Sequence, residues 1–231
     1  MVDAGVMVSL SNQLNTVMGP LLTLGDSAPV KLLYMQTDLI LKNVSKHIQL
    51  SEREKEYFLS LLQWKTLNRN EPLLRPGEIC RTENFIVGGS LRMYAVDDKG
   101  IEHTVMLGIE DWWISDLYSL LTKQPSSYFI AALVPSQLLQ LNREDLEQLY
   151  KKVPGFERFF RIMFQNAFVA QQERIHQNLS LPAAERYAAF LKKYPLLEQR
   201  IPQKYIASYL GMTPVFLSML RKKMASGHLL K

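Results

Sequence analysis

The stretch that decides the fold is residues 203–222, which read QKYIASYLGMTPVFLSMLRK. Gly211 stands where a turn between two helices needs a residue that accepts a positive φ, and Ala207, four residues earlier, is small enough to let two helices cross closely. Thr213 and Pro214 then begin a second helix as its N-cap and first helical residue. The apolar residues of the stretch occupy the positions that pack such a pair together: Ile206, Leu210, Met212, Leu217 and Leu220. This spacing predicts a helix-turn-helix.

A purely structural helical hairpin would share many of these features, so the motif alone leaves that alternative open. The charge distribution favours DNA binding. Residues 186–231 contain nine Lys and Arg but only one acidic residue, Glu198, a net charge of +8. The whole chain carries +5, which leaves −3 for the first 185 residues. A basic C-terminal module on a slightly acidic body is typical of a protein that binds the phosphate backbone of DNA.

The bulk composition limits the remaining classes. A chain of 231 residues can hold two modest domains with proper cores. The single cysteine, Cys80, excludes an internal disulfide framework and fits a reducing cytoplasm, and we expect it to be an inert small residue. No run approaches the ~18 apolar residues of a membrane span, so we expect a cytoplasmic protein with no membrane partner.

The N-terminal half begins with an extension and two helices. Residues 1–34 contain Gly and Pro interruptions and no clear helical face, which predicts a loosely attached extension. A helix is expected over 38–47. A second begins after Ser51, whose spacing to Glu54 forms a capping box, and its apolar side is expected to reach Trp64.

Short strands separated by turns follow, and they predict a small antiparallel β-roll or jelly roll over residues 35–152. A helical piece is expected over 116–121 and another from Asn142 to about Tyr150. The expected strands cover residues 73–74, 84–87, 91–96, 101–107, 128–134 and 137–141.

A long helix is expected from Pro154 to about Asn178, within a linker of residues 153–180. Its apolar positions cover more than one stripe, so it needs partners on two sides. The roll can cover one side, and a second subunit is the natural cover for the other, although burial within one chain is an alternative. The residues expected at the dimer interface are Phe160, Phe164, Ala167 and Phe168. With the helix-turn-helix domain over 181–231, the predicted fold class is α+β.

This order of elements resembles the Crp/Fnr superfamily of bacterial transcription regulators. Three segments look like the opening strands and hairpin of its cyclic-nucleotide-binding-like domain: 73–78 (LLRPGE), 85–92 (FIVGGSLR) and 97–100 (DDKG). Three others look like a branch common in Bacteroidetes: 110–118 (EDWWISDLY), 157–160 (ERFF) and 165–168 (QNAF). The resemblance implies a homodimer that binds double-stranded DNA, with RNA polymerase as a further partner.

The stretch that corresponds to the family's effector-binding segment, residues 115–128 (the effector cassette), departs from the family pattern. Members that bind cyclic AMP hold its ribose with a Gly-Glu pair and its phosphate with an Arg, whereas this chain has Ser115-Asp116 and Ser126-Ser127 there. Asp116 can still accept a ribose hydroxyl. An enclosed phosphate, however, would lack a charge-assisted partner worth roughly 1.5–3 kcal/mol unless Lys123, nearby in the sequence, replaces the arginine. We therefore expect an effector other than cyclic AMP, or none, and no cofactor. The candidate pocket residues are Arg92, Ser115, Asp116, Lys123, Ser126 and Ser127.

The recognition helix departs as well. Positions that usually present Glu and Arg to base edges are Val215 and Met219, which cannot hydrogen-bond a base but can contact a thymine methyl. Backbone binding is therefore predicted more firmly than sharp sequence recognition. The residues expected to contact DNA are Lys204, Thr213, Pro214, Val215, Ser218, Met219, Arg221, Lys222 and Lys223.

Enzyme classes find little support in the chain. Its four histidines are scattered, and His103, the one on an expected strand, faces away from Glu102, which argues against a metal-dependent cupin. No Ser-His-Asp arrangement, P-loop or dinucleotide fingerprint is present. Trp112 and Trp113 are expected to anchor the roll against neighbouring helices, with a platform for a ligand as the alternative. We expect no catalytic residue and no metal site.

The leading interpretation is a homodimeric DNA-binding transcription regulator of the Crp/Fnr type that does not respond to cyclic AMP. The alternative is a ligand-binding or protein-interaction module whose DNA reader has degenerated.

Overall fold

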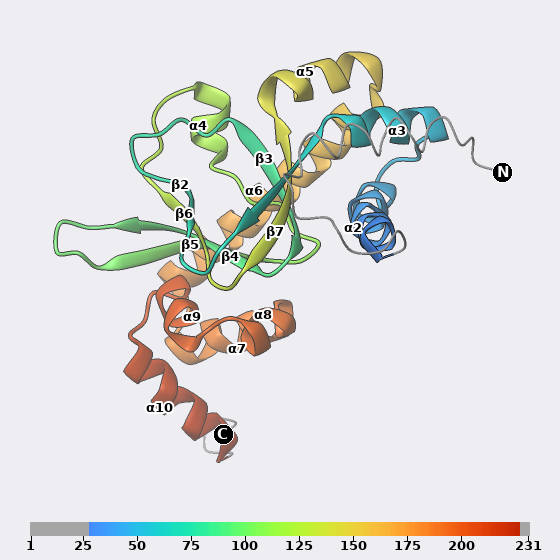
Figure 1. Ribbon diagram of the computed structural model, residues 1–231. Coiled ribbons are helices and arrows are strands. Elements are labelled where there is room, and N and C mark those ends of the chain that lie inside the picture. The colour runs from blue at the N-terminus through green and yellow to red at the C-terminus, as the bar shows by residue number, and fades with distance from the viewer. Residues whose placement is uncertain (1–27, 227–231) are drawn as a thin grey trace. The chain divides into compact units, whose positions relative to one another are not determined.

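The computed structural model describes residues 28–226 of the chain (Figure 1). The chain divides into two compact units, Met1–Leu39 and Ile40–Lys231. Of the first, the described part is the beginning of helix α2 (Ala28–Ser45), which starts ten residues before the predicted Asp38. The expected N-terminal extension is therefore helical from Ala28, and its residues 1–27 lie outside the described part.

The N-terminal half of the second unit is an antiparallel β-roll, as predicted. One sheet has the order β1-β7-β3 and the other the order β2-β6-β4-β5, and all neighbouring strands run antiparallel. The first sheet consists of β1 (Leu62–Leu67), β3 (Thr82–Gly88) and β7 (Ser136–Asn142). The second consists of β2 (Pro72–Leu74), β4 (Ser90–Val96), β5 (Glu102–Ile109) and β6 (Phe129–Ala132). Strand β5 is thus an edge strand.

The segment after Ser60 corrects one sequence expectation. Helix α3 (Glu52–Ser60) begins at the predicted capping box, with the Ser51 hydroxyl accepting from the Glu54 amide. It ends before Leu62, however, and Trp64 lies on strand β1, not on the helix. Pairing with β7, where Leu62 faces Leu141 and Trp64 faces Leu139, provides backbone hydrogen bonds that override the local helical pattern.

The core of the roll lies between its two sheets. Its buried residues are aliphatic for the most part and come from almost every strand: Leu67, Leu74, Cys80, Ile86, Leu91, Met93, Ile114, Leu120, Ile130, Ala132 and Leu138. Burial raises the pKa of the Cys80 thiol, which fits the expected inert role. Gly89, in the turn between β3 and β4, has φ +96°, and a Cβ there would lie 2.2 Å from the Ser136 hydroxyl. The turn therefore requires glycine.

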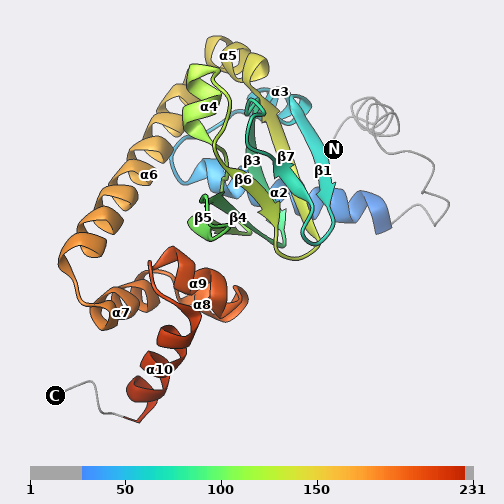
Figure 2. The ribbon, with the colours of Figure 1, turned by 90° about the vertical axis from the view of Figure 1, so that its left-hand side faces the viewer.

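A long helix connects the roll to the C-terminal helices (Figures 1 and 2). After α4 (Leu117–Thr122) and α5 (Arg143–Lys152), helix α6 runs over Gly155–Ser180. Its first turns bury Phe156, Phe159 and Phe160, and the last two rings contact Trp113 edge-on. Trp113 therefore anchors the roll to α6, as expected.

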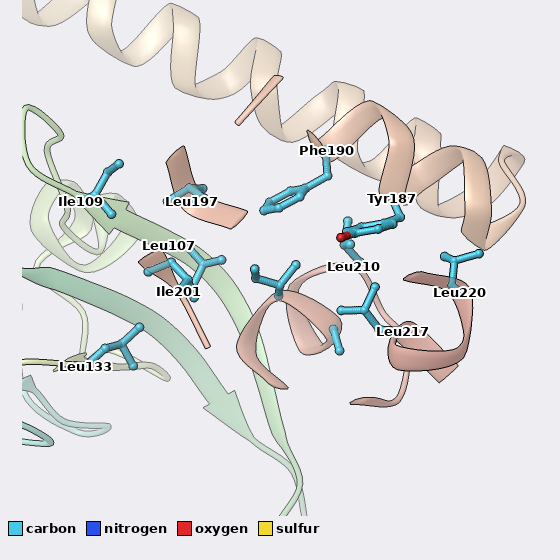
Figure 3. Packing of buried hydrophobic residues seen from close by; sticks show 12 residues of the cluster. Leu107, Ile109, Leu133, Tyr187, Phe190, Leu197, Ile201, Leu210, Leu217 and Leu220 are labelled. Carbon is cyan, nitrogen blue, oxygen red and sulfur yellow. The ribbon is translucent and has the colours of Figure 1, made fainter. Parts of the chain in front are cut away.

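Four further helices complete the described chain: α7 (Ala183–Lys193), α8 (Pro195–Arg200), α9 (Gln203–Tyr209) and α10 (Pro214–Ala225). Figure 3 shows the buried cluster that they share with the roll. Leu107, Ile109 and Leu133 of the roll belong to the same cluster as Phe190 of α7 and Leu197 of α8. Among the described helices, none has the length and apolar run that a membrane span needs.

Candidate nucleic-acid interface and effector site

Helices α9 and α10 form the predicted helix-turn-helix. Gly211 has φ +66° in the turn, and Ala207 is fully buried where the two helices meet. The Thr213 hydroxyl accepts the Phe216 amide at 3.2 Å, so Thr213 is the N-cap of α10, with Pro214 as its first residue. Of the five predicted packing positions, Met212 is half-buried. The other four are buried: Ile206, Leu210, Leu217 and Leu220.

The outward face of α10 is mostly apolar. Val215 is 70% exposed, Phe216 42% and Met219 51%. Ser218 and Lys222 are exposed too, and the spacing 215, 218, 219, 222 places these residues on one helical face. Phe216 was missed by the sequence analysis. The sequence signal that could have indicated its exposure is its place between Val215, expected on the outward face, and Leu217, expected to be buried.

The basic residues predicted to contact DNA differ in exposure and in their contacts with the rest of the chain. Lys222 and Lys223 are exposed in the last turn of α10. Arg221, in contrast, forms an ion pair with Glu198 of α8 at 2.9 Å, which commits its guanidinium to holding the module together. The ammonium of Lys204 lies 4.7 Å from the ring centre of Tyr205, a cation–π contact at the other end of the motif.

Helix α9 covers the free edge of strand β5. The Ser208 hydroxyl accepts the Thr104 amide and donates to the Glu102 carbonyl, both at 2.8 Å. These β5 groups have no strand partner on their outer side, because β5 ends the sheet. The DNA-binding candidate is therefore docked on the roll through the backbone of an edge strand.

Arg174 of α6 ties the same edge to α9. Its guanidinium donates to the carbonyls of Val105 (2.5 Å) and Thr104 (2.9 Å) on β5. It also donates to the Tyr209 carbonyl at the end of α9 (2.8 and 3.2 Å) and stacks 4.0 Å from the Tyr209 ring centre. Burial lowers the pKa of Arg174. No carboxylate of the described chain forms an ion pair with it, so the cation is stabilised by carbonyl dipoles and by the Tyr209 ring.

Two more contacts join the roll to the helix-turn-helix module. The Glu110 carboxylate pairs with Arg200 of α8, with one oxygen 2.6 Å from Nη2. Burial raises the pKa of Glu110, but hydrogen bonds from Arg200 and from the Gly89 amide outweigh it, so the pKa is lowered overall. Arg92 of β4 lies between the rings of Tyr94 (3.8 Å) and Tyr205 (4.1 Å).

The expected effector cassette is closed by its own hydrogen bonds. The Asp116 carboxylate caps α4, accepts the Ser119 amide and takes a 2.6 Å hydrogen bond from Ser126. Ser115 donates to Glu83, which is buried and lacks a partner on its second oxygen among the described residues. Burial raises the pKa of Glu83 to about 7. The structure thus brings Ser115, Asp116 and Ser126 to one buried region.

The other three cassette candidates lie in different settings. Ser127 is exposed. Lys123 is exposed as well, in a left-handed conformation at the end of α4 with φ +61°. The Arg92 guanidinium is engaged by Glu102 at 2.5 Å and by the two tyrosine rings of the docking contact. The cation expected in the pocket thus has its contacts at the interface with α9.

The expected dimer residues fall on different sides of α6. Phe160 is 1% exposed and packs against Trp113 and Tyr150, so it belongs to the core of its own chain and is not a surface residue. Phe168 is 63% exposed. Phe164 is half-buried beside Phe160, and Ala167 borders a cavity within the chain. Other exposed apolar residues of α6 are Val169, Ile175 and Leu179.

The described residues 28–226 contain no cluster of three or more His, Cys, Asp and Glu side chains that could hold a metal ion. His103 pairs with Asp97 in the hairpin between β4 and β5, at 2.8 Å.

Comparisons with known proteins agree with this architecture. The family model described as "Cyclic nucleotide-binding domain" matches residues 64–153. No curated protein sequence matches the chain significantly. Among solved structures, the c-di-GMP-responsive global regulator CLP of Xanthomonas campestris aligns with a TM-score of 0.61 at 15% identity, over 78% of this chain and 95% of CLP.

Two further structures have the same fold. FixK2 of Bradyrhizobium japonicum aligns with a TM-score of 0.63 at 16% identity, over 74% of this chain and 87% of FixK2. A regulator of the Crp/Fnr family from Eubacterium rectale aligns with a TM-score of 0.58 at 18% identity, over 77% and 85% of the two chains. Residues 64–153 therefore match the model of the cyclic nucleotide-binding domain, and about three quarters of the chain shares the fold of these three solved structures.

Proposed function

We propose that this chain is a homodimeric, DNA-binding transcription regulator that does not respond to cyclic AMP. The observation that carries the proposal is the capped helix α10, which presents Val215, Ser218, Met219 and Lys222 on one outward face beside Lys223. A helix of this kind enters the major groove, where lysines meet phosphates and the apolar side chains reach thymine methyls. The proposal includes RNA polymerase as a further partner.

The dimer rests on the outer face of α6. Phe168, Ile175 and Leu179 recur at spacings of seven and four, which places them along one line of the helix. They are 63%, 58% and 83% exposed, and a continuous line of exposed apolar side chains is typical of a contact surface. A second copy with the same line of residues would cover it, and two copies of α10 would match a two-fold symmetric operator.

Insensitivity to cyclic AMP rests on the cassette. The Asp116 carboxylate, the group expected to accept a ribose hydroxyl, is already bonded to Ser126 and to the Ser119 amide. Arg92 binds Glu102 through Nη2 and contacts the rings of Tyr94 and Tyr205, so its charge is held at the contact with α9. A cyclic phosphate would thus enter a buried site without a cation, at the cost of its desolvation.

A direct test measures binding to the DNA upstream of the gene by fluorescence anisotropy over a range of salt, with and without cyclic AMP. We expect binding whose logarithm falls steeply with the logarithm of salt, and no effect of the nucleotide. Each lysine that meets a phosphate contributes about −0.9 to that slope. The double variant Lys222→Ala/Lys223→Ala should flatten it by about two units per subunit, while Lys99→Ala/Lys151→Ala, with the same charge change elsewhere, should leave it unchanged.

Replacing thymine by uracil in the bound duplex tests the apolar reader. The exchange removes only the 5-methyl group, so a loss of affinity for wild-type protein that disappears in Met219→Ala would assign the methyl contact to Met219. Absence of any saturable DNA binding at low salt would refute the proposal.

A second candidate function would then take its place. The three exposed apolar residues Val215, Phe216 and Met219 favour a contact surface for another protein if the helix does not enter DNA. A crosslink placed at Phe216 would capture DNA in the first case and a protein partner in the second.

A further inference from the structure

A cavity of about 430 Å³ lies where the roll, the long helix and the helix-turn-helix module meet. Its volume falls within the ~300–1,000 Å³ of ordinary small-molecule sites. Its walls come from β5, α6, α8 and α9, from the segments that follow β5 and α7, and from Asn43 and His47 at the end of α2 and just after it. Lining residues from the first two groups include Val105, Trp112, Met163, Tyr194, Leu197 and Tyr209.

Small residues on α6 leave this space open. Ala167 and Ala170 face the cavity one turn apart, between Met163 and the carbonyl-bound Arg174. Any larger side chain at either position would occupy the volume. Because the exposed line Phe168, Ile175 and Leu179 lies on a different face of α6, the cavity does not depend on those residues.

The chemistry of the walls selects a flat, uncharged ligand. Five aromatic rings border the space: Trp112, Trp113, Phe159, Tyr194 and Tyr209. None of the described residues that line it is a lysine or arginine. An anion such as a phosphate would therefore find no counter-charge there.

The one acidic group of the lining is already neutralised. The Asp111 carboxylate accepts Asn43 Nδ2 at 2.8 Å and pairs with Lys46, which is 52% exposed. Asn43 in turn accepts the indole N–H of Trp113 at 3.0 Å. His47, Asn166 and Gln171 add neutral hydrogen-bonding groups at the border. A ligand can thus be anchored by one or two polar atoms while its rings stack in the apolar part.

We propose that this cavity is an effector site for a neutral, planar aromatic molecule, and that the bound molecule holds the helix-turn-helix module against the roll. Ser115, Asp116 and Ser126 do not line it, so it is separate from the cassette of the cyclic-nucleotide-binding-like domain. A ligand that touches β5, α6 and α9 together binds only when they are assembled, and its binding energy therefore stabilises the assembly. The site and its effect on docking do not depend on DNA binding.

The test uses N-phenyl-1-naphthylamine, a neutral aromatic dye, on the full chain without DNA. We expect saturable binding of one dye per chain, with energy transfer from tryptophan to the dye, because Trp112 and Trp113 border the cavity. The matched probe is 1-anilinonaphthalene-8-sulfonate, which has the same ring system plus a negative charge. It should bind at least tenfold more weakly, since no cation lines the site.

Two neighbouring positions of α6 provide matched variants. Ala170→Phe fills the cavity and should weaken dye binding at least tenfold, whereas Val169→Phe adds a ring at a 51% exposed neighbour and should not. Circular dichroism and a melting curve show whether Ala170→Phe is folded. If it is not, Ala167→Leu, which takes up less volume, replaces it with the same expectation.

Coupling to docking is measured separately by hydrogen exchange. Saturating dye should slow exchange of the amides of residues 102–107, which α9 and Arg174 cover, in wild type and in Val169→Phe but not in Ala170→Phe. Three outcomes would overturn the proposed site: no saturable dye binding, equal binding by the two α6 variants, or equal affinity for the charged and the neutral dye. Binding without slower exchange would overturn its role in docking.

Discussion

Arg174→Ala should release the helix-turn-helix module from the roll more than any other single change at this interface. The guanidinium satisfies the carbonyls of Thr104, Val105 and Tyr209 at once and stacks on the Tyr209 ring. Removing it leaves three carbonyls of an edge strand and a helix end without a donor. The docked state loses these contacts, whereas in the opened state the same carbonyls bond to water.

The magnitude follows from the hydrogen bonds. A hydrogen bond to a charged group contributes about 1.5–3 kcal/mol. The four bonds to three carbonyls would sum to an upper limit well above the expected effect, because bonds that share one side chain are not additive. We expect about 2–4 kcal/mol, or a thirtyfold to nearly thousandfold rise in the opening equilibrium at about 1.4 kcal/mol per tenfold. Arg174→Lys keeps the charge but not the planar fork, so it should recover less than half.

Hydrogen exchange of residues 102–107 measures this opening, because the Thr104 amide is protected by the Ser208 hydroxyl of α9. Arg161→Ala is the control, since Arg161 lies exposed on the same helix and bonds to Gln165 one turn away. Exchange in Arg174→Ala that matches the Arg161→Ala rate would refute the reasoning that the carbonyl contacts hold the module.

Three further predictions follow from buried or exposed single residues. Glu83 has a pKa raised by burial to about 7, so its contribution to stability is full below pH ~4.5 and is lost as the pH rises through 7. The change in the free energy of unfolding caused by Glu83→Gln, measured by urea unfolding, should therefore be more favourable at pH 8 than at pH 4.5 by up to about 3 kcal/mol. An equal change at both pH values would contradict this. Phe168→Glu should convert the dimer to monomers in light scattering, whereas Val169→Glu should not; a monomeric wild type would remove the basis for this expectation. Gly211→Ala should cost only about 1–2 kcal/mol for its left-handed backbone, because its Cβ meets nothing within 4 Å, while Gly89→Ala should prevent folding through its clash with Ser136; equal melting temperatures would show that space does not decide the difference.

The sequence alone determined those elements whose signals are local. The Gly211 turn, the Thr213-Pro214 start of α10 and the Ser51–Glu54 capping box depend on backbone geometry within a few residues, and all three are confirmed. The antiparallel roll could be predicted because glycine turns and short apolar runs alternate along the chain. A local pattern was misleading where tertiary pairing decided, since Trp64 continues a helical pattern yet pairs with β7.

Only the tertiary structure decided what each candidate site residue touches. Phe160 and Phe168 are the same residue type on one helix, but the position of the roll buries the first and leaves the second exposed. Arg92 was expected in the effector pocket and instead lies between two tyrosine rings, one of them from α9. The docking contacts of Arg174 join segments 35 and about 70 residues apart. No periodicity or motif encodes them, because they are made to backbone carbonyls, which every residue has.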